Sequence, residues 1–587
     1  MKKYKWLAWL MLVPLVLTSC ADILELGGLL TGTTSADIYG EYFEGITPVR
    51  GEIQIETADL STLNLEYSER ELSADYEKGK ATRIVFADSG SAVYGKGAEG
   101  NGKDVTVSVG GTYIVSGSAS GALLSVNAPA EEAVHLVLSD LSLAGKGGTA
   151  IEIRSAASVL LTLEGKNSIS NFAEGKPSAY DKQTDAVILS RADLSVNGSG
   201  SLSVVGNRVH GIASTKALTL LDGKLTVSSS EAGLIGEGCV RIGGGELIVK
   251  AEEEGILSGA VFGDGFSADY EAVDKTTTGY VYISGGSISV TSTGDAICAA
   301  SYFVMKDGVL DLTSGVRIEE PSPETEPEET LPDFWDIFEV QPEAEEASDE
   351  RAFVVFSDGV SAASEALIYG GTLAIKASNH AIYSAGALCI DGGRFYLRAV
   401  HDGLCSDASI GISDGILILE STRIGLLGQS VDISGGYLYV KKTNCGVKTG
   451  GAFRLSGGVC LVAGAKELPL DFGVGTVTGG VLAALGNAKK AREFFPSGKQ
   501  GVLLSHFGVQ GENYPLLVCD NEGRVILSLE GRGEYSCAYL SHPELVRGNA
   551  YTLMSGGFVS SADKYGFAFG AETSIAAEPF AVVTANS

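Results

Sequence analysis

Hydrophobic and polar residues alternate in short segments along most of the chain, and glycine pairs separate many of these segments. After each pair, the second and fourth residues are mostly aliphatic or aromatic, as in Leu225 and Val227 or Leu247 and Val249. A period of two residues is typical of β-strands that bury one face, so these positions point inward and the first and third point outward. The pattern predicts many short strands that share one core.

The glycine pairs return at a fixed distance. Their second members are 22 residues apart from Gly223 to Gly245 (245 − 223), and a spacing of 21 or 22 residues continues from Gly371 to Gly480. A fixed period of this length indicates a solenoid, and it is too short for a propeller blade, which needs about 40 residues. From Ala488 onward the period is lost. We therefore expect an all-β, right-handed parallel β-helix with about 22 residues per coil and an antiparallel β C-terminal cap.

The first twenty residues have the pattern of a bacterial lipoprotein signal peptide. Basic residues at the N-terminus precede the apolar run Trp6–Leu17, and small residues lead to Cys20. The run is too short to span a bilayer. The pattern predicts lipidation of Cys20 and an extracytoplasmic, membrane-anchored protein at the cell surface.

The interruptions of the repeat predict the domain organisation. We expect a signal peptide (1–20), a tether and lead-in segment (21–80), the first half of the β-helix (81–317), an acidic Pro/Glu-rich loop (318–352), the second half (353–487) and a β-rich cap (488–587).

Composition narrows the choice of partners. The formal net charge of the 587 residues is −31, and Glu319 to Glu350 contains acidic residues but no Lys or Arg. Such a charge disfavours nucleic acid as a partner, because phosphate contacts need clustered cations. The cysteines show no Cys-x-x-Cys or Cys/His ligand spacing, which argues against zinc, and Cys519 with Cys537 is the one disulfide pair that we consider.

Several segments resemble a known family. Thr112–Gly117, Val137–Leu141, Tyr280–Gly286 and Ser541–Gly548 are similar to the pectate-lyase-like bacterial carbohydrate-binding β-helix family. Members of that family bind cellulose and polygalacturonate and carry calcium. The resemblance therefore implies the same fold, a polysaccharide partner and Ca²⁺ as a cofactor.

The family's calcium implies acidic residues at one corner of each coil, in a motif that resembles Asp-Asp-Gly-Ile. The matching positions here are Asp185, His210, Ala232, Glu254, Asp295, His380, Asp402, Ile424 and Cys445. A full carboxylate ladder is absent, and Ca²⁺ needs about six to eight oxygens. The best metal cluster combines corner acids with those of an inserted loop: Glu253, Glu254, Asp264, Asp269, Asp274 and Asp295. The alternative is that these are solvated turn acids.

Outward positions of the second half form an apolar and aromatic stripe. It consists of Arg394/Tyr396, Ile416/Ile418, Tyr437/Tyr439 and Val459/Leu461. An apolar patch of this size is expected to bind a ligand or to be covered by another part of the protein. We expect the C-terminal cap to cover the aliphatic members. For the tyrosines two interpretations stay open: cover by the cap, or a carbohydrate-binding platform formed by Arg394, Tyr396, Tyr437 and Tyr439.

Three classes of function agree with these features. The first is a surface-anchored lipoprotein that binds a plant cell-wall type polysaccharide, such as cellulose or polygalacturonate, without cleaving it. The second is a pectate-type polysaccharide lyase, for which Lys216 is the basic residue beside a corner motif. The third is an adhesin or structural β-helix stalk without a sugar ligand. We favour the first.

Overall fold

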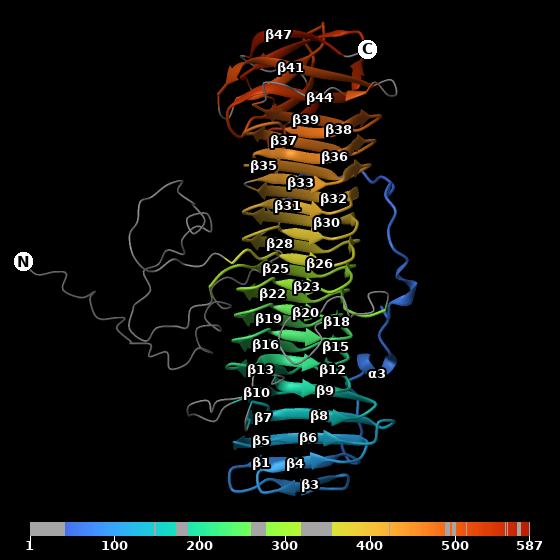
Figure 1. Cartoon of the computed structure of the whole chain (residues 1–587), viewed down its shortest axis with the longest axis vertical. Coiled ribbons are helices and arrows are strands. Elements are labelled where there is room, and N and C mark those ends of the chain that lie inside the picture. The colour runs from blue at the N-terminus through green and yellow to red at the C-terminus, as the bar shows by residue number, and fades with distance from the viewer. Residues whose placement is uncertain are drawn as a thin grey trace, which may run out of the picture.

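A computed structural model describes residues 42–145, 148–171, 186–259, 277–317, 355–421, 423–487, 494–495, 500–511, 514–557, 559, 562–571 and 577–585. There the chain forms a β-solenoid of about 14 turns with coils of about 22 residues, and a small antiparallel sheet lies at its C-terminal end (Figure 1). The predicted all-β parallel solenoid with an antiparallel cap is confirmed. The predicted signal peptide and acidic loop lie outside the described residues.

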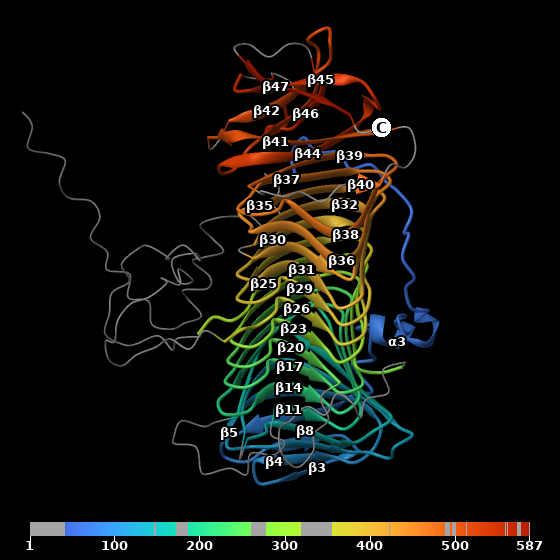
Figure 2. The same ribbon diagram turned by 45° about the horizontal axis from the view of Figure 1, so that its top comes forward.

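Three faces surround the interior, and each is a parallel sheet with one strand per coil. Strands of the corner face follow the corner motif and form a single row along the solenoid (Figure 2). They are β4 (Asp104–Val107), β6 (Leu124–Asn127), β8 (Ile151–Ser155), β11 (Ala186–Ser190), β14 (His210–Ser214), β17 (Leu234–Gly236), β20 (Ile256–Ser258), β23 (Ile297–Ala299), β26 (Val360–Ala362), β29 (Ile382–Ser384), β31 (Asp402–Ser406) and β33 (Ile424–Gly428).

The second face is called the strap face here, after the segment that covers it. Its strands are β9 (Ser158–Glu164), β12 (Asp193–Asn197), β15 (Ala217–Leu220), β18 (Cys239–Ile242), β21 (Tyr280–Ile283), β24 (Phe303–Met305), β27 (Ala366–Ile368), β34 (Ser430–Ile433) and β40 (Phe494–Phe495).

The third face, the glycine face, contains the strands that follow the glycine pairs or their equivalents. They are β10 (Lys166–Ser170), β13 (Ser201–Gly206), β16 (Lys224–Ser229), β19 (Glu246–Ala251), β22 (Ser287–Ser292), β25 (Val309–Thr313), β28 (Thr372–Ala377), β35 (Tyr437–Lys441), β37 (Val459–Ala465) and β39 (Val481–Gly486).

Some strands run through a corner and pair within two faces. These are β5 (Gly111–Ser120), β7 (Ala133–Ala144), β30 (Leu388–Ala399), β32 (Ser409–Ser421), β36 (Cys445–Leu455) and β38 (Leu470–Val477). The first coil also contains β1 (Thr82–Ala87), β2 (Ala92–Tyr94) and β3 (Ala98–Asn101), of which β2 and β3 pair antiparallel with β1 and β4.

The glycine pairs are needed because the coils stack at this corner. Gly245 has φ +79°, a conformation that L side chains rarely adopt, and a Cβ built there would lie 2.7 Å from the carbonyl oxygen of Gly223 in the neighbouring coil. Gly223 itself has φ +89°. A side chain at this corner would therefore cost both backbone strain and a steric clash, so the 22-residue period is kept by glycine.

The core is the interior of the solenoid, as the alternation predicts. In β19, Leu247, Val249 and Ala251 are buried, whereas Glu246 and Lys250 are exposed. The register pairs Leu225 with Leu247 and Val227 with Val249, so like side chains stack along the interior. One continuous apolar column results, and it holds the three faces together.

The C-terminal cap combines an edge pairing with a separate sheet. Strand β44 (Tyr535–Val546) pairs antiparallel with β39 of the last coil and with β41 (Gln500–Gln510). The separate sheet has the order β46 (Ala568–Ala571), β43 (Val525–Glu530), β42 (Pro515–Cys519), β45 (Ala550–Ser555) and β47 (Glu578–Thr584). Neither Cys519 nor Cys537 takes part in a disulfide, so the disulfide that we considered is not formed.

Residues 42–80, the strap, lie along the outside of the solenoid before the first coil begins. They run from the cap end towards the opposite end and contain the 3-10 helix η1 (Leu60–Thr62) and the helix α3 (Glu69–Leu72), which packs beside β12 (Figure 1). The strap contacts the solenoid at several points along its path. Tyr42 stacks on Tyr396 near the cap, and Tyr67 bonds the hydroxyl of Ser284 at 3.0 Å. Residues 42–80 of the predicted tether and lead-in segment are thus part of the folded structure.

A ladder of buried polar groups on the strap face ends on the strap. His135 Nε2 lies 2.7 Å from Thr162 Oγ1, which donates to Asn197 Oδ1, and Asn197 Nδ2 donates to the carbonyl oxygens of Glu71 and Ser73 at 2.9 and 3.0 Å. Because the Thr162 hydroxyl donates to Asn197, it accepts from Nε2–H of a neutral His135. Burial, with a smaller contribution from Arg70, lowers the pKa of His135 to about 4.

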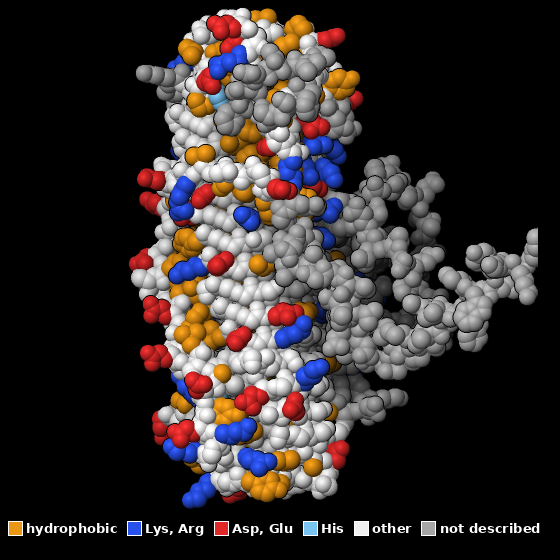
Figure 3. Space-filling view, turned by 180° about the vertical axis from the view of Figure 1, so that it is seen from behind, with side chains coloured by type: hydrophobic (Ala, Val, Ile, Leu, Met, Phe, Trp, Pro, Cys, Tyr) orange, Lys and Arg blue, Asp and Glu red, His pale blue; other side chains and the backbone are white. Residues whose placement is uncertain are grey.

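The outer surface has a mixed character. The side seen in Figure 3 shows acidic and basic side chains scattered among small polar groups and backbone. Among the described residues, no helix has the length and apolar character needed to cross a membrane.

The His135 ladder predicts that strap docking weakens in acid. The folded pKa of about 4 lies below the ordinary value of 6.5, so the unfolded or undocked state binds the proton more tightly. The contribution of neutral His135 to strap docking is therefore complete above about pH 6.5 and is lost progressively as the pH falls towards 4.

Hydrogen exchange of the strap amides should show this loss in the wild-type protein and a flatter profile in His135→Gln. The exposed His506→Gln is the control and should keep the wild-type profile. An unchanged slope in His135→Gln would contradict the assignment.

Candidate functional site

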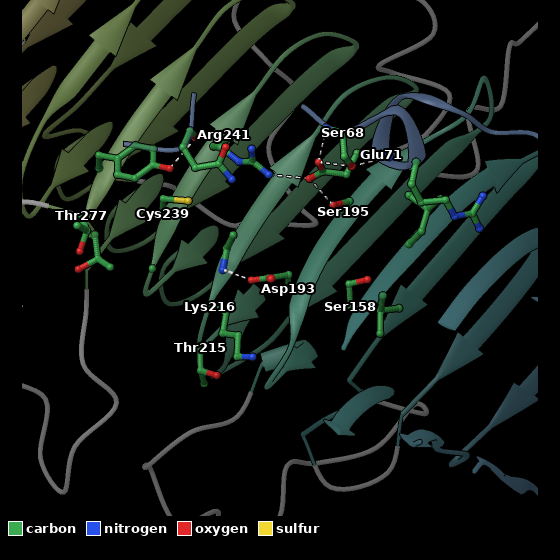
Figure 4. Close-up of a pocket in the computed structure, with 18 residues that line it drawn as sticks. Ser68, Glu71, Ser158, Asp193, Ser195, Thr215, Lys216, Cys239, Arg241 and Thr277 are labelled. Carbon is green, nitrogen blue, oxygen red and sulfur yellow. Dashed lines mark hydrogen bonds and ion pairs between the residues drawn. The ribbon is translucent and has the colours of Figure 1, made fainter. Parts of the chain in front are cut away.

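A pocket of about 600 Å³ lies between the strap and the strap face (Figure 4). Its floor is built by the outward side chains at the start of successive strands, where Ser158, Asp193, Ala217, Cys239 and Tyr280 occupy equivalent register positions. The strap contributes one side through Asn64, Ser68, Arg70 and Glu71, and Thr215, Lys216, Thr277 and Thr278 contribute further polar groups. The pocket therefore exists because the strap crosses the coils.

Glu71 fixes the strap at this pocket. Its Oε2 accepts from the backbone nitrogen of Ser68 at 2.8 Å in a capping box at the N-terminus of α3. Its Oε1 accepts from Arg241 at 2.6 Å and from Ser195 at 3.2 Å. Burial alone would raise the pKa of Glu71, but the hydrogen bonds from Ser68 and Ser195 and the charge of Arg241 lower it overall. Glu71 is thus an ionised link between helix, strap and solenoid.

The charged groups of the pocket differ in their freedom to meet a ligand. Arg241 is 4% exposed and binds Glu71, the hydroxyl of Thr219 and the carbonyl oxygen of Glu66, whereas Lys216 and Arg70 are exposed. Asp193 is exposed and accepts from the backbone nitrogen of Ala217 at 3.2 Å. Hydroxyl groups, one carboxylate and two exposed cations suit a polar ligand that carries hydroxyls and a negative charge.

A second polar feature follows the corner of the later coils. The register places Glu254, Asp295, Asp358, His380 and Asp402 in one column, because Ile256, Ile297, Val360, Ile382 and Leu404 pair in order. We call these five residues the corner column. Asp358 belongs to it although the sequence comparison of corner motifs omitted it, since the acidic loop interrupts the period just before.

Hydrogen bonds connect the corner column from coil to coil. Asp295 accepts from the backbone nitrogen of Asp358 at 2.7 Å and from Ser361 at 2.6 Å. His380 lies between two carboxylates, with Nδ1 3.0 Å from Asp358 Oδ1 and Nε2 3.2 Å from Asp402 Oδ2. Burial lowers the pKa of His380, but hydrogen bonds with Asp358, Asp402 and Cys405 outweigh it and raise the pKa to about 11.

The donor set of the corner column does not match calcium. Both oxygens of Asp402 pair with Arg423, and one oxygen of Asp358 accepts from His380 and Asn379. Ca²⁺ needs about six to eight oxygen ligands, and several lone pairs of Asp358 and Asp402 already accept from N–H donors, so these two carboxylates alone fall short of a calcium site. Among the described residues, one group of three metal donors converges, namely His380, Asp402 and Cys405. The structure thus provides a candidate metal-binding group of mixed nitrogen, oxygen and sulfur donors.

The predicted calcium cluster is only partly described. Glu253 is exposed, Glu254 and Asp295 are half-buried, and Asp264, Asp269 and Asp274 lie outside the described residues. Burial and the neighbouring Asp358 raise the pKa of Asp295 to about 7 despite its hydrogen bonds. The corner column brings Glu254 and Asp295 together, and the cluster as a whole stays a prediction.

The aromatic stripe is covered, which decides between the two interpretations. Tyr396, Tyr437 and Tyr439 are at most 7% exposed and pack with Ile416, Ile418 and Leu461 against the cap. The strap and cap supply the partners: Tyr396 stacks on Tyr42, Tyr437 donates to Asp563 at 2.6 Å and Tyr439 stacks on Tyr565. The sugar platform predicted for these tyrosines is therefore wrong, because the cap needs an apolar face to pack on. Arg394 is exposed beside this interface.

Sequence reasoning missed most of the pocket. Lys216 is recognisable because it lies beside a corner motif, but Arg241 and Asp193 give no signal of their own. A capping box at Ser68 and Glu71 was readable in the sequence, and it indicates where α3 begins. The amino-acid sequence alone does not show that this helix packs against β12.

Comparisons with known proteins identify a family and similar proteins. The family described as "Carbohydrate-binding domain-containing protein" matches residues 101–403 and 343–467. A curated protein of that description from Acetivibrio thermocellus is 30% identical over 130 residues, which are 22% of this chain and 46% of the relative, so the match spans about half of the relative's length. A solved structure of a polysaccharide lyase-like protein from C. thermocellum, a gadolinium derivative, has 26% identity and a TM-score of 0.35, and it covers 40% of this chain and 92% of that one.

The Glu71–Arg241 pair predicts how firmly the strap is held. Replacing Arg241 by Met leaves the partly buried Glu71 without its cation, so local opening of the strap should become easier by about 3 kcal/mol, the low end for breaking a buried ion pair. Arg50→Ala is the matched control, because Arg50 also joins strap to solenoid but is 65% exposed in its pair with Asp391. That change should cost less than about 1 kcal/mol. Hydrogen exchange measures the opening of residues 66–73 in the first variant and of residues around Arg50 in the second, and equal effects would show that the buried pair has no special role.

Proposed function

The chain belongs to the carbohydrate-binding domain family, and on this premise we propose that it binds a polysaccharide without cleaving it. The pocket beneath the strap is the proposed binding site. Its elongated floor repeats from coil to coil, as do the units of a polysaccharide. The single observation that carries the proposal is the grouping of hydroxyls and exposed cations in a pocket of about 600 Å³ on a chain of this family.

An acidic glycan of the polygalacturonate type is the proposed ligand class. The chain carries a formal charge of −31, yet this pocket exposes Lys216 and Arg70 to solvent. A uronate carboxylate would bind these cations through charge-assisted hydrogen bonds, while sugar hydroxyls would bind Ser158, Asp193 and Thr215. A neutral glucan such as cellulose is less favoured as the ligand, because the tyrosines that would stack on its sugar rings are buried under the cap.

We propose binding without cleavage because the matching family is described by carbohydrate binding. Lyase chemistry would use a basic residue, and a divalent cation that neutralises the uronate would assist it. Among the described residues, the one group of three metal donors lies at the corner column and not in the pocket. The calcium cluster around Glu253, Glu254 and Asp295 is proposed only together with the inserted loop acids, and a chelator tests its contribution to glycan binding.

We further propose that the protein is tethered to a membrane through a lipid on Cys20. The support is the sequence pattern of residues 1–20. A tether there places the lipid on the N-terminal side of the strap, so the solenoid would stand beyond the membrane surface with its pocket accessible to extracellular glycans.

Lys216→Ala should weaken binding of polygalacturonate by roughly tenfold, because one charge-assisted hydrogen bond contributes about 1.5 kcal/mol or more. Lys224→Ala is the matched control. It also removes an exposed lysine, but Lys224 lies on the glycine face and pairs with Glu246 at 2.8 Å. Isothermal titration calorimetry with oligogalacturonates measures both, and equal losses would point to a general charge effect. Appearance of unsaturated products during the titration would instead establish a lyase.

Cys20→Ala should prevent lipidation and leave the protein as an unprocessed precursor or release it from the membrane. Fractionation of cells that express the variant, followed by mass analysis of the N-terminus, measures this. Cys239→Ala changes a buried cysteine of the pocket floor and should leave membrane retention unchanged. Retention of Cys20→Ala in mature form would refute the anchor and would leave the glycan proposal untouched.

A further inference from the structure

His380, Asp402 and Cys405 bring three different donor atoms together at the corner column. One ligand atom from each lies within 4.8 Å of the other two. Asp402 is fully buried, Cys405 is 6% exposed and His380 is mostly buried. A tetrahedral ion bound at about 2.0 to 2.3 Å holds its ligand atoms roughly 3.5 Å apart, so small side-chain shifts suffice to bind one.

The neighbours orient these three residues as a metal site requires. His380 Nδ1 lies 3.0 Å from Asp358 Oδ1, which directs Nε2 towards Asp402 at 3.2 Å. Metal-binding histidines usually donate their other ring N–H to a carboxylate in this way. Arg423 donates to both carboxylate oxygens of Asp402, from Nε to Oδ1 at 2.9 Å and from Nη2 to Oδ2, and fixes the plane of that carboxylate. The lone pair of Oδ2 that faces His380 Nε2 is then the one that an ion would use.

We propose that His380, Asp402 and Cys405 bind a divalent transition-metal ion of the zinc type. Imidazole and thiolate are the ligands that such ions prefer, whereas Ca²⁺ prefers oxygen. Three protein ligands leave a fourth position for water. Binding displaces the Nε2 proton of His380 and the thiol proton of Cys405, and both leave to solvent.

The site depends on the fold and not on a local motif. His380 begins the coil of β29, and Asp402 and Cys405 belong to β31 of the next coil. It is separate from the strap pocket, so this proposal stands whether or not a glycan binds there.

Cobalt gives the most direct test, because a Co²⁺–thiolate bond produces a near-ultraviolet charge-transfer band and tetrahedral Co²⁺ absorbs strongly in the visible range. The purified full chain, stripped of metal, should develop both with equimolar Co²⁺, and Zn²⁺ should abolish them. A large excess of Ca²⁺ should not. Absence of the bands, or their loss upon addition of Ca²⁺, would overturn the proposal.

Variants assign the ligands. Cys405→Ser should remove the charge-transfer band, and Cys445→Ser is the matched control, since Cys445 occupies the same corner two coils further and is also buried. His380→Gln should weaken Zn²⁺ binding at least tenfold, and the positioning variant Asp358→Asn by about 10- to 100-fold. Circular dichroism establishes that each variant is folded. A band that persists in Cys405→Ser, or vanishes in Cys445→Ser, would refute the assigned ligands.

Discussion

The parallel register between successive coils is the constraint on which the rest of the structure depends. Strands pair with the strand about 22 residues later, or further along the chain where a loop is inserted, so one position of the repeat becomes a column along the solenoid. A residue type that suits one coil is then placed about 4.8 Å from its equivalent in the next. Apolar columns fill the interior, glycine columns form a corner, and polar columns on the outside need partners.

Side chains of the outward columns find partners in two ways. On the strap face, the ladder that starts at His135 ends on backbone oxygens of the strap, which has neither strands nor a share in the repeat. On the glycine face, apolar outward positions of the last coils are covered by the cap. Both coverings join residues far apart in the sequence, as Tyr42 with Tyr396 and Tyr565 illustrates. The surfaces that bind the strap and the cap are therefore assembled from several coils.

The sequence pattern predicts the environment of positions that repeat in every coil. It does not predict contacts that one residue makes with a segment outside the repeat. Leu247 and Gly245 are predictable because every coil poses the same steric problem. The burial of Tyr437 is not, because alternation says only that it points outward and not that Asp563 meets it there. Asp358 was missed because the preceding insertion hides the period, and Cys405 because ligand spacing was sought among neighbours in sequence. Their chemistry becomes visible only when the register brings coils together.

The corner column explains why a full carboxylate ladder is absent. Stacked carboxylates about 4.8 Å apart repel one another, and burial increases the repulsion because solvent no longer screens it. His380 is positioned between Asp358 and Asp402, and Arg423 then neutralises Asp402, so this end of the column carries alternating charges. Asp295 has no cation next to it in the column, and burial together with the neighbouring Asp358 raises its pKa to about 7. A raised pKa means that the folded state binds this proton more tightly than the unfolded state, so Asp295 destabilises the fold increasingly as the pH rises from about 4 to 7. The end of the column from Asp358 to Asp402 can thus stay charged without a bound metal, whereas Asp295 is stabilised by a proton or a cation.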